Sequence, residues 1–101
     1  MAEQELVRRL EKAALETKLR LLDLCHQTLI HIGGDLSVCD MMTAIWQYAM
    51  RYDVKDPHWE GRDRFVLSKG HTAPGLYAAL ANRGFFPVED LATLRHIDSY
   101  L

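Results

Sequence analysis

The sequence feature that most constrains the fold is a short apolar run, Phe65-Val66-Leu67, because nothing else in the chain reads convincingly as a buried strand. Four polar or small residues, Ser68-Lys69-Gly70-His71, interrupt this run. Thr72-Ala73-Pro74 then opens a helical pattern with a capping residue and an early proline. We therefore predict a strand at 64–68, a turn, and a helix at 73–83.

Helical periodicity dominates the first half of the chain. Apolar or small side chains recur in steps of three and four, which predicts one long amphipathic helix at 4–29. Its expected buried face consists of Val7, Leu10, Ala14, Thr17, Leu21, Leu24 and Thr28. The pair Gly33-Gly34 is expected to stop this helix. A second helix is predicted at 38–52, since Ser37 followed by Asp40 is similar to a capping box.

A last helix is predicted at 87–97, where Pro87 suits the first turn. Four helices and one strand do not make a sheet, because a lone strand leaves the backbone groups of both edges unpaired. The sequence therefore predicts an α/β fold, of which residues 1–101 hold the mostly helical N-terminal part. The remaining strands of a parallel sheet are expected beyond Leu101.

Composition narrows the function classes. The chain has 12 basic and 14 acidic residues, a net charge of −2, and no basic stripe, so neither nucleic acid nor an anionic membrane is an expected partner. No secretory leader and no apolar run of bilayer length is evident. Cys25 and Cys39 are isolated and fit reduced, packed thiols, which favours the cytoplasm.

The turn after the predicted strand is the first candidate site. Ligands of open α/β sheets bind where a strand's carboxyl end meets a helix's amino end, and the helix dipole there favours an anion. Gly70 would let a ligand approach the backbone, and the His71 side chain would donate a hydrogen bond. Ser68 and Lys69 are further possible phosphate donors, although a strand-end serine and a solvated lysine need no ligand to explain them. The pattern predicts a phosphate or diphosphate site.

Other motifs stand around this turn in a specific order. His31-Ile32-Gly33-Gly34 lies upstream, Asp56-Pro57-His58-Trp59-Glu60 precedes the strand, and a helix ending in Asn82-Arg83-Gly84 follows it. At these spacings the chain resembles the start of the thiamine-diphosphate domain of transketolase, from about residue 10 to residue 101. The segment Leu-Ser-Lys-Gly-His-Thr-Ala-Pro is similar to the corresponding segment of transketolases whose two halves are separate polypeptides.

The resemblance implies an enzyme that transfers a two-carbon ketol unit between sugar phosphates, with thiamine diphosphate and Mg²⁺ as cofactors. It implies that His31 is the first active-site histidine, which hydrogen-bonds the substrate or intermediate. It also implies that His71 contacts the cofactor's diphosphate, with Gly70 and Ser68 beside it. Leu29-Ile30 stands where the family usually has Ser-Gly before the first of these histidines. Three other histidines show no metal-ligand spacing and are expected to be structural or on the surface, namely His26, His58 and His96.

Several parts of a transketolase are absent from these residues. The family holds its metal with a Gly-Asp-Gly motif and a downstream Asn, and neither is present. A Gly-His-Pro segment is expected just after Leu101. No metal ligand is therefore assigned in this chain, which alone is expected to be inactive. The resemblance implies pairing with a C-terminal transketolase half or subunit, in a homo- or hetero-oligomer such as a dimer.

Two alternatives remain open at the level of sequence. Another thiamine-diphosphate enzyme, such as deoxyxylulose-phosphate synthase, would share the Gly-His turn, although residues 62–71 fit transketolase better. A chain of another class, a non-catalytic remnant or helical interaction module, would keep the pattern without the site. The sequence directly downstream of Leu101 separates enzyme from remnant, because a continuation through Gly-His-Pro and Gly-Asp-Gly supports an enzyme.

Overall fold

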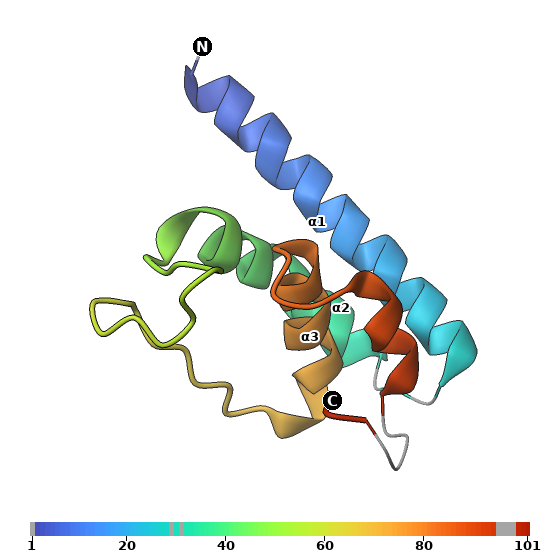
Figure 1. Cartoon of the computed structure of the whole chain (residues 1–101). Helices are drawn as coiled ribbons and strands as arrows, with labels where there is room; N and C mark the ends of the chain where they lie inside the picture. Colours follow the sequence, from blue (N-terminus) through green and yellow to red (C-terminus); the bar gives the residue numbers. More distant parts are fainter. Residues whose placement is uncertain (1, 29, 31, 95–98) are drawn as a thin grey trace.

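The computed structural model describes residues 2–28, 30, 32–94 and 99–101, and this part of the chain is helical (Figure 1). The α-helices are α1 (Ala2–Gln27), α2 (Ile32–Ala44) and α3 (Ala73–Asn82). The π-helical turn η1 (Ile45–Ala49) prolongs α2, the 3₁₀ turn η2 (Gly70–Thr72) leads into α3, and the 3₁₀ helix η3 (Val88–Thr93) comes last. None of the described helices combines the length and apolarity that crossing a bilayer requires.

Helix α1 lies along the other helices and extends past them at its N-terminal end (Figure 1). It begins and ends two residues before the predicted 4–29. Its buried face consists of Ala13, Ala14, Thr17, Leu21 and Leu24. Val7, expected on that face, is 51% exposed because the first two turns project beyond α2 and α3. An ion pair between Lys18 Nζ and Asp40 Oδ1, at 2.9 Å, joins α1 to α2.

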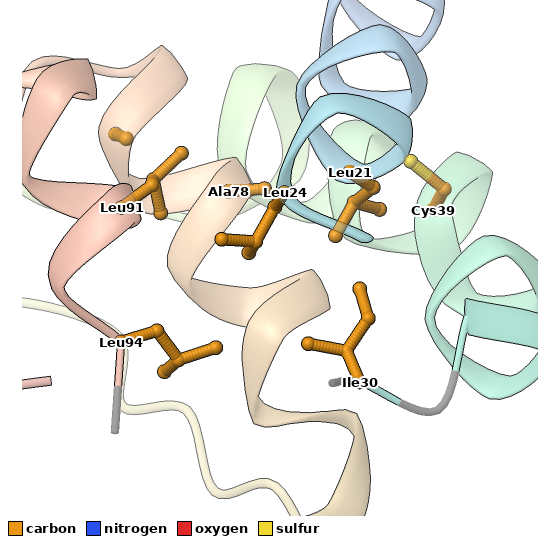
Figure 2. Packing of buried hydrophobic residues seen from close by; sticks show 8 residues of the cluster. Leu21, Leu24, Ile30, Cys39, Ala78, Leu91 and Leu94 are labelled. Atoms are coloured by element: carbon orange, nitrogen blue, oxygen red, sulfur yellow. The ribbon is translucent and has the colours of Figure 1, made fainter. Parts of the chain in front are cut away.

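The main hydrophobic core fills the space between α1, α2, α3 and η3 (Figure 2). Its buried members are Leu21, Leu24, Ile30, Cys39, Ala78, Ala81, Leu91 and Leu94. Cys39 is 1% exposed, and burial raises the pKa of its thiol to about 11. Cys25 is exposed instead of packed, so the prediction of two buried thiols holds only for Cys39.

A second cluster surrounds the indole of Trp46. The rings of Tyr52, Phe65 and Phe85 lie 5.2, 5.6 and 5.7 Å from it, at the tilted and edge-on angles that aromatic pairs prefer. Arg83 Nε donates a hydrogen bond of 2.6 Å to the Tyr52 hydroxyl. These contacts hold the segment that follows η1 against α3.

Helix α2 begins at Ile32, earlier than the predicted helix 38–52, and the glycine pair lies inside its first turn. Ser37 is not a cap, because its hydroxyl donates to the Gly34 carbonyl at 2.8 Å within the helix. Packing explains the glycine: a Cβ at Gly34 would lie 3.1 Å from Thr72 Cγ2. The predicted stop signal is therefore a close-contact position between helices.

The predicted strand 64–68 is absent from the described part of the chain, which contains no strand. The backbone there is not helical, and its side chains still alternate. Phe65 and Leu67 pack against the second cluster, whereas Val66 is 85% exposed. An isolated segment of this kind has no ladder to join, and a ladder needs a second strand.

The ends of the last two helices differ. Gly84 ends α3 as predicted, with φ of 87°, and two backbone bonds close a Schellman motif, Gly84 N to Ala81 O and Phe85 N to Leu80 O. The predicted helix 87–97 is instead the 3₁₀ helix η3, and Leu94 leaves it with φ of −49° and ψ of 129° so that its side chain enters the core. Residues 95–98 lie outside the described part.

Candidate cofactor site

The turn that carries the predicted cofactor residues leads directly into α3. Both the backbone N and the hydroxyl of Thr72 donate to the Lys69 carbonyl, at 2.9 and 2.8 Å. Thr72 is the N-cap residue of α3, but this bond commits its hydroxyl to the turn, and it caps no amide of the helix. The local sequence thus closes a tight turn and leaves the helix end to be satisfied by other groups.

The three residues predicted to contact the cofactor, Ser68, Gly70 and His71, are all exposed on this turn. Apart from Gly70 and its two neighbours in the chain, no described residue has a heavy atom within 4 Å of where a Cβ of Gly70 would be, so none of them blocks a ligand on that side. Lys69 is exposed next to them. A hydroxyl, an ammonium group and an imidazole thus gather on four consecutive residues, a donor set suited to phosphate oxygens.

The first turn of α2 lies directly against this turn. A Cβ built at Gly34 would lie 3.7 Å from both Cδ2 and Nε2 of the His71 ring, in addition to its contact with Thr72. The α2 segment that follows His31 in the sequence is therefore a neighbour of His71. His31 itself lies outside the described residues, and its predicted role stays a prediction.

Asp35 is a residue of this region that the sequence analysis did not single out. It is fully buried, and its Oδ1 accepts a hydrogen bond from the backbone N of Gly75 at 2.9 Å. The α3 amides were expected to face an anion, and one of them instead binds this carboxylate. The available signal was a lone acidic residue in an otherwise apolar or small stretch at 32–39.

The two other histidines that the structure describes, His26 and His58, are not part of this turn. His26 and His58 are exposed on α1 and in the loop before the predicted strand, and His96 lies outside the described residues. Among the residues that the structure describes, no group of three or more His, Cys, Asp or Glu side chains could hold a metal ion.

The geometry is that of a donor-rich turn before a helix, and comparison of the sequence identifies its family. Residues 13–101 match the family model described as the transketolase, thiamine diphosphate binding domain. This chain belongs to the transketolase family. The resemblance seen in the motifs is confirmed, and the turn of Ser68, Gly70 and His71 falls inside the matched range.

The relatives of this chain include proteins named as transketolase subunits and proteins named simply as transketolase. A 6-deoxy-6-sulfo-D-fructose transketolase subunit from Clostridium sp. (strain MSTE9) is 53% identical over 64 residues, which are 63% of this chain and 23% of that protein. An apulose-4-phosphate transketolase subunit from Phocaeicola vulgatus is 38% identical over 96 residues, 94% of this chain and 34% of that protein. The transketolase of Mus musculus is 41% identical over 87 residues, 83% of this chain and 14% of that protein. The chain thus spans between 14% and 34% of the length of these relatives.

Proposed function

We propose that this chain is the N-terminal part or subunit of a transketolase-like transferase that moves a two-carbon ketol unit between sugar phosphates, such as pentose phosphates. The observation that carries the proposal is the family match over residues 13–101, which includes the exposed donor turn before α3. The matching model and these relatives are all named for transketolase, which favours it over the deoxyxylulose-phosphate synthase alternative.

The residues of the turn fit the diphosphate of thiamine diphosphate. His71 would donate from its imidazole, Ser68 from its hydroxyl, and the open backbone at Gly70 would permit close approach. When bound, thiamine diphosphate would supply the carbanion chemistry, and the protein would supply position and electrostatics. His31 would hydrogen-bond the substrate and help move a proton at its developing alkoxide oxygen.

We further propose that the exposed run at 64–68 becomes a strand when the other strands of a parallel sheet are present. Phe65 and Leu67 already face the helices, and Val66 would face the opposite layer. Amide hydrogen exchange tests this: the amides of 65–67 should exchange rapidly in the isolated chain and become protected in the complete assembly. Equal exchange in both would contradict the proposal.

The metal ligands and a C-terminal transketolase half or subunit would come from outside these residues, giving a homo- or hetero-oligomer. Two of the relatives are themselves named as subunits, which supports a split arrangement. The free thiols of Cys25 and Cys39 fit a reducing compartment, the cytoplasm. Mg²⁺ would neutralise the diphosphate, so the chain alone should bind thiamine diphosphate weakly and show no turnover.

The alternative, a helical interaction module, is favoured by one observation. Leu15, Leu19 and Leu22 share the outer face of α1 and are each more than half exposed, at 57%, 56% and 51%. A module of this kind would bind a partner through α1 without using the turn at 68–71. The transketolase function therefore requires His71, whereas the interaction module requires the three exposed leucines.

The test combines this chain with the polypeptide encoded directly after Leu101 and with any C-terminal transketolase subunit encoded beside it. Two-carbon transfer from a ketose phosphate to an aldose phosphate should require thiamine diphosphate and Mg²⁺. His71→Ala should weaken thiamine diphosphate binding, measured by calorimetry, by about tenfold or more, because it removes a hydrogen bond to a charged group. His58→Ala is the matched control and should bind like the unmodified protein.

Two results would contradict the proposed function or the need for further parts. A folded assembly that binds no thiamine diphosphate would overturn the proposed function, and loss of assembly in Leu19→Asp would then support the interaction module. Turnover by the pure chain, with contaminating enzyme excluded, would contradict the need for further parts. Circular dichroism beforehand verifies that each protein is folded.

A further inference from the structure

Asp35 is a buried acidic residue that links the beginnings of two helices. It lies in the first turn of α2, is 0% exposed, and accepts a hydrogen bond at its Oδ1 from the backbone N of Gly75 in the first turn of α3. The two residues are 40 positions apart in the sequence. A hydrogen bond to a carboxylate in a buried place is one of the stronger kinds.

The start of α3 needs this partner because its own sequence does not cap it. The hydroxyl of Thr72, at the N-cap, is bound to the Lys69 carbonyl instead. Pro74 has no N–H, so Gly75 is the next residue after Ala73 with an amide to satisfy. Asp35 therefore performs, from α2, the capping role that a side chain at the N-cap usually performs, and its charge suits the positive helix end.

Two glycines allow the helix starts to come this close. A Cβ at Gly75 would lie 3.2 Å from Val38 Cγ2 and 3.3 Å from Asp35 Oδ1. A Cβ at Gly34 would lie 3.1 Å from Thr72 Cγ2 and 3.7 Å from the His71 ring. The contact between the first turns of α2 and α3 is thus tight on both sides of the Asp35–Gly75 hydrogen bond.

We propose that Asp35 is a positioning residue for the turn at 68–72. By capping α3 from α2, it fixes the turn that presents Gly70 and His71 relative to the segment that enters α2 after His31. The link to cofactor binding rests on the proposed function, whereas the positioning of the turn does not. Asp35 acts through Gly75 and not by touching the cofactor.

The decisive experiment measures amide hydrogen exchange of the 101-residue chain by NMR. In Asp35→Ala, amides at 70–76 should exchange about tenfold faster relative to those of the core part of α1, because one hydrogen bond to a charged acceptor is lost. Asp35→Asn keeps a carbonyl oxygen that can accept from Gly75 N and should restore most of the protection. The His71 ring resonances should shift in the alanine variant and stay close to their original position in the asparagine variant.

Thr17→Ala is the matched control. It removes another buried hydrogen bond, Thr17 Oγ1 to Ala13 O at 2.9 Å, but on α1 and away from the turn. Thr17→Ala should leave the exchange rate of 70–76 divided by that of α1 unchanged, or lower this ratio if α1 itself exchanges faster. Gly75→Ala is a second route that keeps the carboxylate while pushing the two first turns apart, and it should loosen 70–76 as Asp35→Ala does.

The outcomes separate the two proposals. An unchanged exchange ratio in Asp35→Ala, or an asparagine variant as loose as the alanine variant, would overturn the positioning role. In the complete assembly with Mg²⁺, Asp35→Ala should also raise the Kd for thiamine diphosphate about tenfold, while Thr17→Ala should not. If the unmodified assembly binds no thiamine diphosphate, the proposed function fails, and the exchange measurement still decides the role of Asp35.

Discussion

The helical core and the exposed segment at 65–67 both consist of apolar residues, but their side chains differ in burial. In the core, Leu21, Leu24 and Leu94 are between 0% and 4% exposed. In the segment, Phe65 and Leu67 are only partly buried, and Val66 is 85% exposed. A helix satisfies its backbone groups internally, whereas an extended run needs a neighbouring strand. The interiors of the helices therefore need no partner for their backbone groups, whereas the segment before the candidate site depends on what pairs with it.

Removing a core leucine should have the largest effect on this contrast. We expect Leu21→Ala to lower the free energy of unfolding by about 3 kcal/mol, because it leaves a cavity where the side chain is fully buried. Leu19→Ala, on the same helix but 56% exposed, should change it by less than about 0.5 kcal/mol. Urea unfolding followed by circular dichroism measures both. Equal losses in the two variants would mean that α1 is not packed as described.

Within the exposed segment, the two faces should respond differently. We expect Phe65→Ala to lower the free energy of unfolding by about 1.5 kcal/mol, because it removes a ring from the aromatic cluster around Trp46. This is roughly half of the loss for a fully buried phenylalanine, since Phe65 is only partly buried. Val66→Ala should stay within about 0.5 kcal/mol in the isolated chain. The same urea unfolding experiment compares them. A larger loss for Val66 than for Phe65 would show that the segment lies on the helices the other way round.

These contrasts explain what could be predicted from the sequence. The helices α1 and α3 follow from the spacing of their apolar residues, and the end of α3 follows from Gly84. The start of α2 does not, because Gly33-Gly34 is a local stop signal with an unfavourable helix propensity of about 1 kcal/mol per glycine. The close contact between α2 and the turn before α3 overrides that cost.

The candidate site was predictable only where it is local. His71, Gly70 and Ser68 follow from the break after Phe65-Val66-Leu67, and all three lie on one exposed turn. Asp35 could not be assigned, since its partner Gly75 is distant in the sequence and only the packing of α2 against α3 brings them together. The apolar run predicts a strand at 64–68, but a strand forms only where a second strand pairs with it.

Substitutions at two glycines in the helical region test how strongly local backbone propensity affects stability. We expect Gly84→Ala to lower the free energy of unfolding by about 1 kcal/mol, because its φ of 87° is strained for any residue with a Cβ. Gly33→Ala should raise it by up to about 1 kcal/mol, since the position is helical and, among the described residues, no atom outside its own stretch of chain lies within 4 Å of the added Cβ. Thermal unfolding of the pair provides the measurement. A loss of stability in Gly33→Ala would mean that this glycine has a role beyond the helix.

The smallest expected effect concerns the hydrogen bonds between Arg51 and Asp63, which close the loop before the exposed segment. Asp63 Oδ2 accepts from Arg51 N at 2.8 Å, its Oδ1 accepts from the Arg51 guanidinium at 3.3 Å, and Asp63 N donates to Arg51 O at 2.7 Å. The Arg51 backbone N–H, and then its guanidinium, lower the pKa of the Asp63 carboxyl from its usual 3.8.

A lowered pKa in the folded state fixes the sign of the pH dependence. The contribution of the Arg51–Asp63 contact to folded-state stability is fully present above pH 3.8 and is lost as the pH falls through the lowered pKa of Asp63. We expect the ¹³C carboxyl resonance of Asp63 to titrate below that of the same residue in the urea-unfolded chain. Arg51→Gln should keep most of the difference, because the larger cause is a backbone N–H that this variant retains. A folded-state midpoint at or above the unfolded one would show that the loop is not tied at Arg51, and the exposed segment would then lack a fixed start as well as a partner strand.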